Sequence, residues 1–151
     1  MDKKFILVVD DDKGILKSFS AILELKGYRV STAESGQEAI EKYQANYYNL
    51  ALIDIKLPDL EGTELIKQFN LINPGAKKIM VTGYATLENA IKSLNWGADG
   101  YLQKPVPPTK LLSFVADKLM EQEVENDLNE DIVIDLLRAK KQDEQNLDRW
   151  T

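Results

Sequence analysis

Four apolar runs in this chain are each followed directly by a polar, reactive side chain. The runs cover residues 5–9, 50–53, 79–81 and, more weakly, 101–103, and helical patterns of about a dozen residues separate them. This alternation predicts parallel strands joined by crossover helices. The polar groups would then lie together at the carboxyl edge of one sheet, where open α/β folds bind ligands. They are Asp10 with Asp11, Asp54, Thr82, and Lys104 with Pro105.

The rest of the pattern completes five strand and helix units. A second, edge-like strand is predicted over residues 28–32, and Ser35 and Thr86 are predicted to cap the second and fourth helices. The expected fold is a doubly wound, five-stranded parallel α/β sheet in the flavodoxin-like order 2-1-3-4-5, with a C-terminal helical extension. In the fourth helix, the residues expected to face inward are Ala90, Ile91 and Leu94.

The amino-acid composition excludes several kinds of catalytic and metal-binding site. The chain has no cysteine and no histidine, so disulfides, thiolate nucleophiles and the usual zinc ligands are excluded. Any reaction here must use carboxylates, hydroxyls and amines. No apolar run approaches the roughly 20 residues needed to cross a bilayer, and the short apolar segment near Met1 ends in acids rather than in a cleavage site. We therefore expect no membrane insertion and a cytoplasmic location.

The net charge of −6 arises entirely in the last 31 residues. Residues 1–120 hold 15 acids and 15 bases, whereas residues 121–151 hold 10 acids and 4 bases. An acidic segment repels phosphate backbones, so we expect no direct binding of nucleic acid by this part of the chain. We divide the chain into a main domain of residues 1–121 and an acidic, partly amphipathic segment of residues 122–151, which is either a helical tail or a linker to an absent output module.

This C-terminal segment carries its own apolar pattern. Val124 and Leu128 continue a row at i, i+4 spacing, while Asn126 and Asn129 predict a break or kink near residues 126–130. Thirty residues cannot form a core alone, so the apolar side chains are expected to pack on the main domain, on a second copy, or on a partner outside this chain. The stretch after the predicted break contains Ile132, Val133, Leu136, Leu137 and Ala139.

Asp10, Asp11 and Asp54 would crowd three carboxylates at the ends of two neighbouring strands. Two unit charges about 4 Å apart repel by roughly 4 kcal/mol at an effective dielectric of 20, so a cation is needed to offset the repulsion. Mg²⁺ is the natural choice, because it is a hard ion that takes oxygen ligands and needs only one or two carboxylates. The alternative for aspartates after a strand is turn and helix capping, which is the role that we assign to Asp12.

Thr82 and Lys104 would add a hydroxyl and an ammonium at the same edge of the sheet, and an ammonium suits binding of a phosphoryl oxygen. Taken singly, each has an ordinary interpretation, Thr82 as a strand end and Lys104 as a solvated loop charge. Their joint position with the carboxylates is what indicates a site.

In these motifs the chain resembles the response-regulator receiver domain of two-component signalling. The resemblance covers about residues 3–121 and rests on VVDD at 8–11, LIDIKLPDLEG at 52–62, MVTGYA at 80–85 and GYLQKPV at 100–106. It implies a phosphorylation-activated signalling switch in which Asp54 accepts a phosphoryl group from a histidine kinase or a histidine phosphotransfer protein. It also implies that the chain is no enzyme beyond its own phosphorylation and dephosphorylation.

The same resemblance implies roles for the neighbouring residues. Asp10 and Asp11 would hold Mg²⁺ together with Asp54 and the backbone carbonyl of Lys56. The side chains of Thr82 and Lys104 would bind the phosphoryl oxygens.

The resemblance also implies roles for Pro105, Tyr101, Lys56 and Tyr84. Pro105 would follow Lys104 through a cis peptide bond. Tyr101 matches the aromatic switch position and would rotate into space that Thr82 vacates, although an aromatic at this position also packs without switching. Access of the hydrolytic water would depend on Lys56 and Tyr84.

The sequence does not determine the effector of this chain or its oligomeric state. The chain is either a stand-alone receiver or the receiver part of a longer transcription factor or effector enzyme. A homodimer would use the surface of the fourth helix, fifth strand and fifth helix, or the C-terminal segment.

The enzymatic alternative to a signalling switch is a phosphohydrolase with an aspartate nucleophile, as in haloacid-dehalogenase-like enzymes. Those enzymes carry a second acid two residues after the nucleophile, whereas Asp54 is followed by Ile55 and Lys56.

Overall fold

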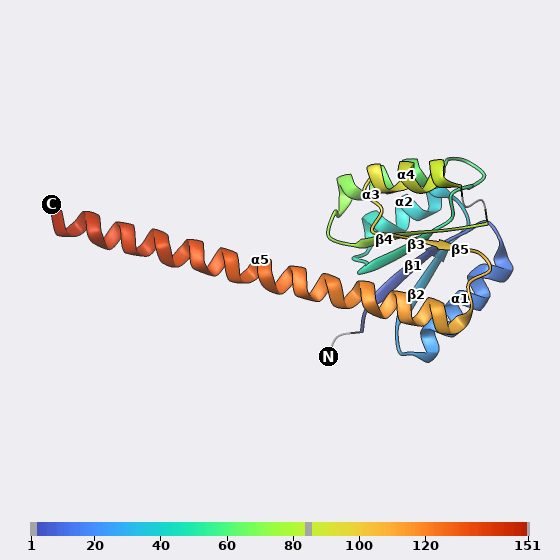
Figure 1. Cartoon of the computed structure of the whole chain (residues 1–151), viewed down its shortest axis with the longest axis horizontal. Helices are drawn as coiled ribbons and strands as arrows, with labels where there is room; N and C mark the ends of the chain where they lie inside the picture. The colour runs from blue at the N-terminus through green and yellow to red at the C-terminus, as the bar shows by residue number, and fades with distance from the viewer. Residues whose placement is uncertain (1–2, 84–85, 151) are drawn as a thin grey trace. The chain divides into compact units, whose positions relative to one another are not determined.

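The computed structural model describes residues 3–83 and 86–150, the last four of these by their backbone alone. All four strand pairings are parallel, and the sheet has the order β2-β1-β3-β4-β5 (Figure 1). The predicted α/β fold and its strand order are confirmed. The elements in chain order are β1 (Phe5–Val9), α1 (Lys13–Leu25), β2 (Arg29–Ala33), α2 (Gly36–Ala45), β3 (Leu50–Ile53), α3 (Gly62–Ile72), β4 (Lys77–Thr82), α4 (Leu87–Asn95), β5 (Gly100–Gln103) and α5 (Pro108–Trp150).

Each face of the sheet buries a separate set of apolar side chains. Along β1, Leu7 and Val9 pack with residues of α2 and α3, while Ile6 and Val8 pack with residues of α1 and the first turns of α5. Figure 1 shows α2, α3 and α4 over one face and α1 over the other. Every residue of β3 is buried, as expected for a central parallel strand that is covered on both faces.

The predicted helix caps are confirmed. Asp12 begins α1, Ser35 begins α2 and Thr86 begins α4, and each side-chain oxygen accepts a backbone N–H of the first turn. These bonds satisfy donors that a helix start leaves without an intrahelical partner. Because Asp12 is engaged in this way, its role differs from that of the two aspartates before it.

The inward face of α4 differs from the prediction. Ile91 and Leu94 are 50% and 60% exposed, whereas Ala90 is half-buried and Ser93 is fully buried. The Ser93 hydroxyl donates to the Asn89 carbonyl at 2.8 Å, which satisfies it without a partner on another element. The side that α4 turns to the core is therefore made of small residues, and the larger apolar side chains flank it in contact with solvent.

Helix α5 is continuous from Pro108 to Trp150, so the predicted break near residues 126–130 is wrong. Asn126 and Asn129 lie within the helix, where each costs less than about 1 kcal/mol in helix propensity. That cost is too small to end a long helix. The chain divides into two compact units between Leu119 and Met120. Among the residues that the structure describes, no helix is long and apolar enough to cross a membrane.

Candidate functional site

Two buried aspartates follow adjacent strands at the carboxyl edge of the sheet. Val9 and Ile53, the last residues of β1 and β3, are paired in the parallel register, and the Asp54 N–H donates to the Val9 carbonyl at 2.9 Å. Asp10 and Asp54 are only 3% and 7% exposed. Asp11 is exposed, yet it offers a carboxylate oxygen that lies within 4.8 Å of oxygens from the other two aspartates. The predicted convergence of Asp10, Asp11 and Asp54 is thus present.

Lys104 reaches this cluster from the end of β5. Its Nζ lies 2.6 Å from Asp10 Oδ2 and 3.4 Å from Asp54 Oδ2. The Lys104 backbone N–H donates to the Thr82 carbonyl at 2.9 Å, which fixes the position where Lys104 leaves the sheet. The Lys104–Pro105 peptide bond is cis. Thr82, at the end of β4, is completely buried.

The charges of the cluster are mutually dependent. Burial raises the pKa of Asp54, the negative charge of Asp10 raises it further, and both Lys104 and the Lys56 backbone N–H oppose the rise. Burial acts against the positive charge of Lys104, but the two aspartates outweigh it, so the pKa of this lysine is raised. Lys104 therefore stays charged and compensates only part of the negative charge of the aspartates.

The donor set fits a hard divalent cation. Asp10, Asp11 and Asp54 contribute three carboxylates against the single ammonium of Lys104, which leaves a formal charge of −2 at the site. Carboxylate oxygens of this number and spacing suit Mg²⁺ or Ca²⁺. Because Asp11 is exposed while the other two aspartates are buried, the cluster opens to solvent on the Asp11 side.

Backbone contacts join the two ends of the loop between β3 and α3, next to Asp54. The Gly62 N–H donates to the Ile55 carbonyl at 2.6 Å, and Lys56 and Glu61 form an isolated antiparallel bridge. A Cβ at Gly62 would lie 2.3 Å from the backbone oxygen of Asp54, so only glycine permits this close approach. The loop therefore fixes the backbone on both sides of Asp54.

Asp59 anchors the same loop to α2, a role that sequence reasoning missed. Its carboxylate accepts the backbone N–H groups of Gly36 and Gln37, both at 2.8 Å. These two hydrogen bonds lower the pKa of Asp59. The partners are more than twenty positions away in the chain, so local spacing carries no signal for the contact.

Tyr101 and Lys56 are the remaining predicted site residues that the structure describes. Tyr101 on β5 is half-buried against the core that includes Met80, and its hydroxyl is buried with no hydrogen-bond partner among the described residues. The side chain of Lys56 is exposed, while its backbone faces the carboxylate of Asp54. Tyr84 lies outside the residues that the structure describes.

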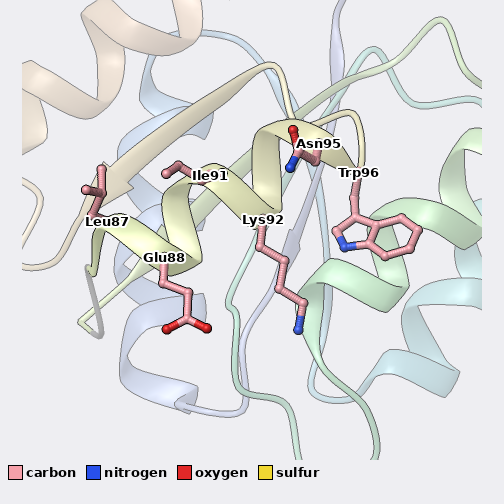
Figure 2. Close-up of a pocket in the computed structure, with 6 residues that line it drawn as sticks. All are labelled: Leu87, Glu88, Ile91, Lys92, Asn95 and Trp96. Atoms are coloured by element: carbon pink, nitrogen blue, oxygen red, sulfur yellow. The ribbon is translucent and has the colours of Figure 1, made fainter.

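A shallow groove of about 710 Å³ lies along α4, apart from the carboxylates. Figure 2 shows the side chains that line it, all from α4 and the residue after it. Lys92 in this groove also lies 3.4 Å from Glu61 Oε2, in the loop after Asp54. The groove thus adjoins a contact between α4 and the loop that follows Asp54. Its lining residues are Leu87, Glu88, Ile91, Lys92, Asn95 and Trp96.

Comparison with known proteins places most of the chain in one group. A sequence model described as "Response regulator receiver domain" matches residues 6–116. The transcriptional regulatory protein ZraR of Klebsiella oxytoca is 35% identical over 114 residues, which are 76% of this chain and 26% of that protein. The alginate biosynthesis transcriptional regulatory protein AlgB of Pseudomonas putida is 32% identical over 114 residues, 76% of this chain and 25% of AlgB. This chain spans about a quarter of the length of these curated relatives.

Solved structures give the same grouping. A CheY-like receiver domain protein from Methanospirillum hungatei JF-1 is 54% identical with a TM-score of 0.80, covering 82% of this chain and 99% of that one. A response regulator from Burkholderia pseudomallei, solved with a phosphorylated aspartic acid, a calcium ion and citrate, is 29% identical with a TM-score of 0.72, covering 84% and 75%. The beryllofluoride-activated NtrC4 receiver domain dimer is 31% identical with a TM-score of 0.75, covering 78% and 98%.

Proposed function

Because this chain belongs to the response regulator receiver domain family, we propose that it is a phosphorylation-activated signalling switch whose phosphoacceptor is Asp54. The observation that carries the proposal is a carboxylate placed beside a second buried carboxylate and a lysine ammonium at the edge of the sheet. A receiver domain is not a conventional enzyme, so the chemistry to explain is one transfer onto the protein itself.

In the proposed transfer, an Asp54 carboxylate oxygen attacks the phosphorus of a phosphohistidine. The new O–P bond forms as the P–N bond breaks, and the imidazole leaves with the electron pair. The histidine must come from the partner, a histidine kinase or a histidine phosphotransfer protein, because this chain has none. Lys104 would release its contact with Asp54 and bind a phosphoryl oxygen, and the Thr82 hydroxyl would bind another.

The carboxylates of Asp10, Asp11 and Asp54 and the backbone carbonyl of Lys56 would hold Mg²⁺. When bound, the ion would supply positive charge that offsets repulsion between the carboxylates and the incoming phosphoryl group. The three carboxylate oxygens within 4.8 Å of one another support this assignment. Lys104 alone offsets one negative charge of the three.

Phosphorylation adds about 1.5 to 2 negative charges next to Thr82 and Lys104. We propose that Thr82 moves toward the phosphoryl group and that Tyr101 rotates into the space released. The rotation would break no hydrogen bond, because the Tyr101 hydroxyl has no hydrogen-bond partner among the described residues. This supports the proposed movement. The rotation would alter the surface of α4, β5 and α5, where the exposed side chains of α4 offer a contact area for a partner.

The proposal extends to assembly and context. The chain would act in the cytoplasm, and it would form a homodimer through the α4, β5 and α5 surface or through the tail. The NtrC4 receiver domain, which was solved as a dimer, supports self-association without indicating which of the two surfaces is used. Residues 1–121 would form the receiver and residues 122–151 the tail or linker.

A second candidate function is the receiver part of a longer transcriptional regulator, which the greater length of ZraR and AlgB favours. The length of the complete reading frame decides between the two.

The test is incubation with a small-molecule phosphodonor and Mg²⁺, followed by measurement of acid-stable, base-labile phosphate. Asp54→Asn is expected to abolish incorporation. Asp12→Asn is the matched control, because asparagine also caps helices well and Asp12 lies at the start of α1. Equal incorporation into wild type and Asp54→Asn would remove Asp54 from the acceptor role.

Tyr84 carries a separate prediction about the lifetime of the phosphorylated state. A bulky side chain at this position would hinder the hydrolytic water, so Tyr84→Ala is expected to lose phosphate faster than wild type. The measurement is the decay of labelled protein after the donor is removed. Equal or slower decay in the variant would reject this role for Tyr84.

A further inference from the structure

The second unit of the chain exposes apolar side chains on a helix that has no core of its own. Within the segment from residue 128 to residue 141, six apolar side chains are between 40% and 64% exposed. A helix of this composition gains most of its stability by packing an apolar face against another element. The six are Leu128, Ile132, Val133, Ile134, Leu136 and Leu137.

The charges of this segment are divided between its two halves. Residues 128–134 contain Glu130 and Asp131 and no base, a charge of −2. Residues 135–141 contain one acid and three bases, a charge of +2. Two such helices side by side in the parallel direction would set −2 against −2 and +2 against +2, whereas the antiparallel direction sets each half against its opposite. Like charges that face each other destabilise a contact, whereas opposite charges stabilise it and determine its orientation. The charges of this segment therefore favour the antiparallel direction.

The repulsion between acids in and next to residues 128–134 is not offset by bases of the same half. Just before and within the segment, Asp127 and Asp131 stand four positions apart, as do Asp131 and Asp135. Like charges at this spacing destabilise an isolated helix by roughly 0.2 to 0.5 kcal/mol per pair. A basic partner surface would remove this penalty.

The basic half presents a matching surface. A shallow groove of about 410 Å³ is lined by Ile134 and Leu137, with three bases and one acid beside them: Arg138, Lys140, Lys141 and Glu144. An apolar floor whose charged edge is positive on balance suits a helix whose apolar side chains are accompanied by acids. Residues 128–134 of this same chain have that character.

We propose that residues 128–141 of α5 pair with the same residues of a second copy, antiparallel, as a self-association site of this protein. Aligned about the midpoint of the segment, Ile132 lies opposite Leu137 and Asp131 lies opposite Arg138, since both pairs of numbers sum to 269. The symmetry makes every contact occur twice. The proposal does not depend on phosphate transfer to Asp54, and it commits the assembly to the tail.

Sedimentation across a concentration series tests the association. Wild type is expected to shift from monomer to dimer, and the double variant Leu136→Lys, Leu137→Lys is expected to raise the dimer dissociation constant by about tenfold or more, because it places unpaired charges in the contact. Leu25→Lys is the matched control, because Leu25 is 88% exposed and lies in α1. A wild-type monomer at every concentration, or an unchanged constant in the double variant, overturns the proposal.

Orientation is tested with single cysteines, which the natural chain lacks. Asn129→Cys and Lys140→Cys are opposite each other in the antiparallel pair, so an equimolar mixture in a glutathione buffer is expected to give mostly the mixed disulfide. Two 129 positions would be about 16 Å apart along the axis, beyond the roughly 7 Å that a disulfide spans. Predominant disulfides between identical variants would contradict the antiparallel arrangement and support a parallel pair instead.

Discussion

Replacing Lys104 with methionine tests how the acidic site is balanced. The Lys104 Nζ contacts Asp10 Oδ2 at 2.6 Å and Asp54 Oδ2 at 3.4 Å, and methionine would keep an unbranched side chain without the charge. With oxygens of the two aspartates within 4.8 Å of each other, their charges repel by about 3.5 kcal/mol at an effective dielectric of 20. Removing one partner of a buried ion pair typically costs about 3 to 5 kcal/mol.

Because the Lys104 side chain is 19% exposed, we expect the lower end of that range. The free energy of unfolding of Lys104→Met should be about 3 kcal/mol below that of wild type at pH 7. Urea unfolding followed by far-UV circular dichroism gives the value. Lys92→Met is the control, since Lys92 and its partner Glu61 are 50% and 67% exposed and such a pair contributes at most about 1 kcal/mol.

The dependence on pH follows from the raised pKa of Asp54. A carboxyl group whose folded-state pKa is raised stabilises the fold while protonated, and that stability is lost as the pH rises through the folded-state pKa. Lys104 opposes the rise, so its removal raises the pKa of Asp54 further. The deficit of Lys104→Met should therefore shrink as the pH falls from 7 toward 4.

Mg²⁺ should also restore part of the stability of Lys104→Met, because a ligand at 100 times its dissociation constant adds about 2.7 kcal/mol. A loss no larger than that of Lys92→Met, or a deficit that grows at low pH, would refute the charge balance described for this site.

Two further variants probe the loop after Asp54. Asp59→Ala should lower the free energy of unfolding by about 1 kcal/mol at pH 7, because it removes a side-chain cap from α2. The pKa of Asp59 is lowered in the folded state, so this difference should disappear as the pH falls below about 4, and a difference that persists in urea unfolding at low pH would contradict it. Gly62→Ala should cost about 1 to 3 kcal/mol, because its Cβ would meet the Asp54 carbonyl oxygen at 2.3 Å. Gly75→Ala is the control, with its nearest contact at 3.4 Å, and equal loss in the two glycine variants would dismiss the steric account.

The fold and the carboxylate cluster could be predicted because their signals are local. The strands β1 and β3 are buried apolar runs that end directly before Asp10 and Asp54, so parallel strand order alone brings these two aspartates together. Caps are local as well, since Asp12, Ser35 and Thr86 bond to N–H groups two or three positions on.

Other features depend on contacts that sequence spacing does not encode. Lys104 is predicted at the same sheet edge as Asp10, but the two residues are 94 positions apart and only the finished sheet sets the distance between Lys104 Nζ and Asp10 Oδ2 at 2.6 Å. The two hydrogen bonds from α2 to Asp59 are hidden for the same reason. The exposure of Ile91 and Leu94 follows from which narrow face of α4 meets the core, a choice that helical periodicity alone leaves open.

The central claim is that the fold makes one particular carboxylate the phosphoryl acceptor. Borohydride reduction of the phosphorylated protein converts an aspartyl phosphate into homoserine, and peptide mass spectrometry then locates it. We predict homoserine at position 54 alone, dependent on both phosphodonor and Mg²⁺. Homoserine at position 10 or 11, or at any other aspartate with position 54 unchanged, would contradict the account.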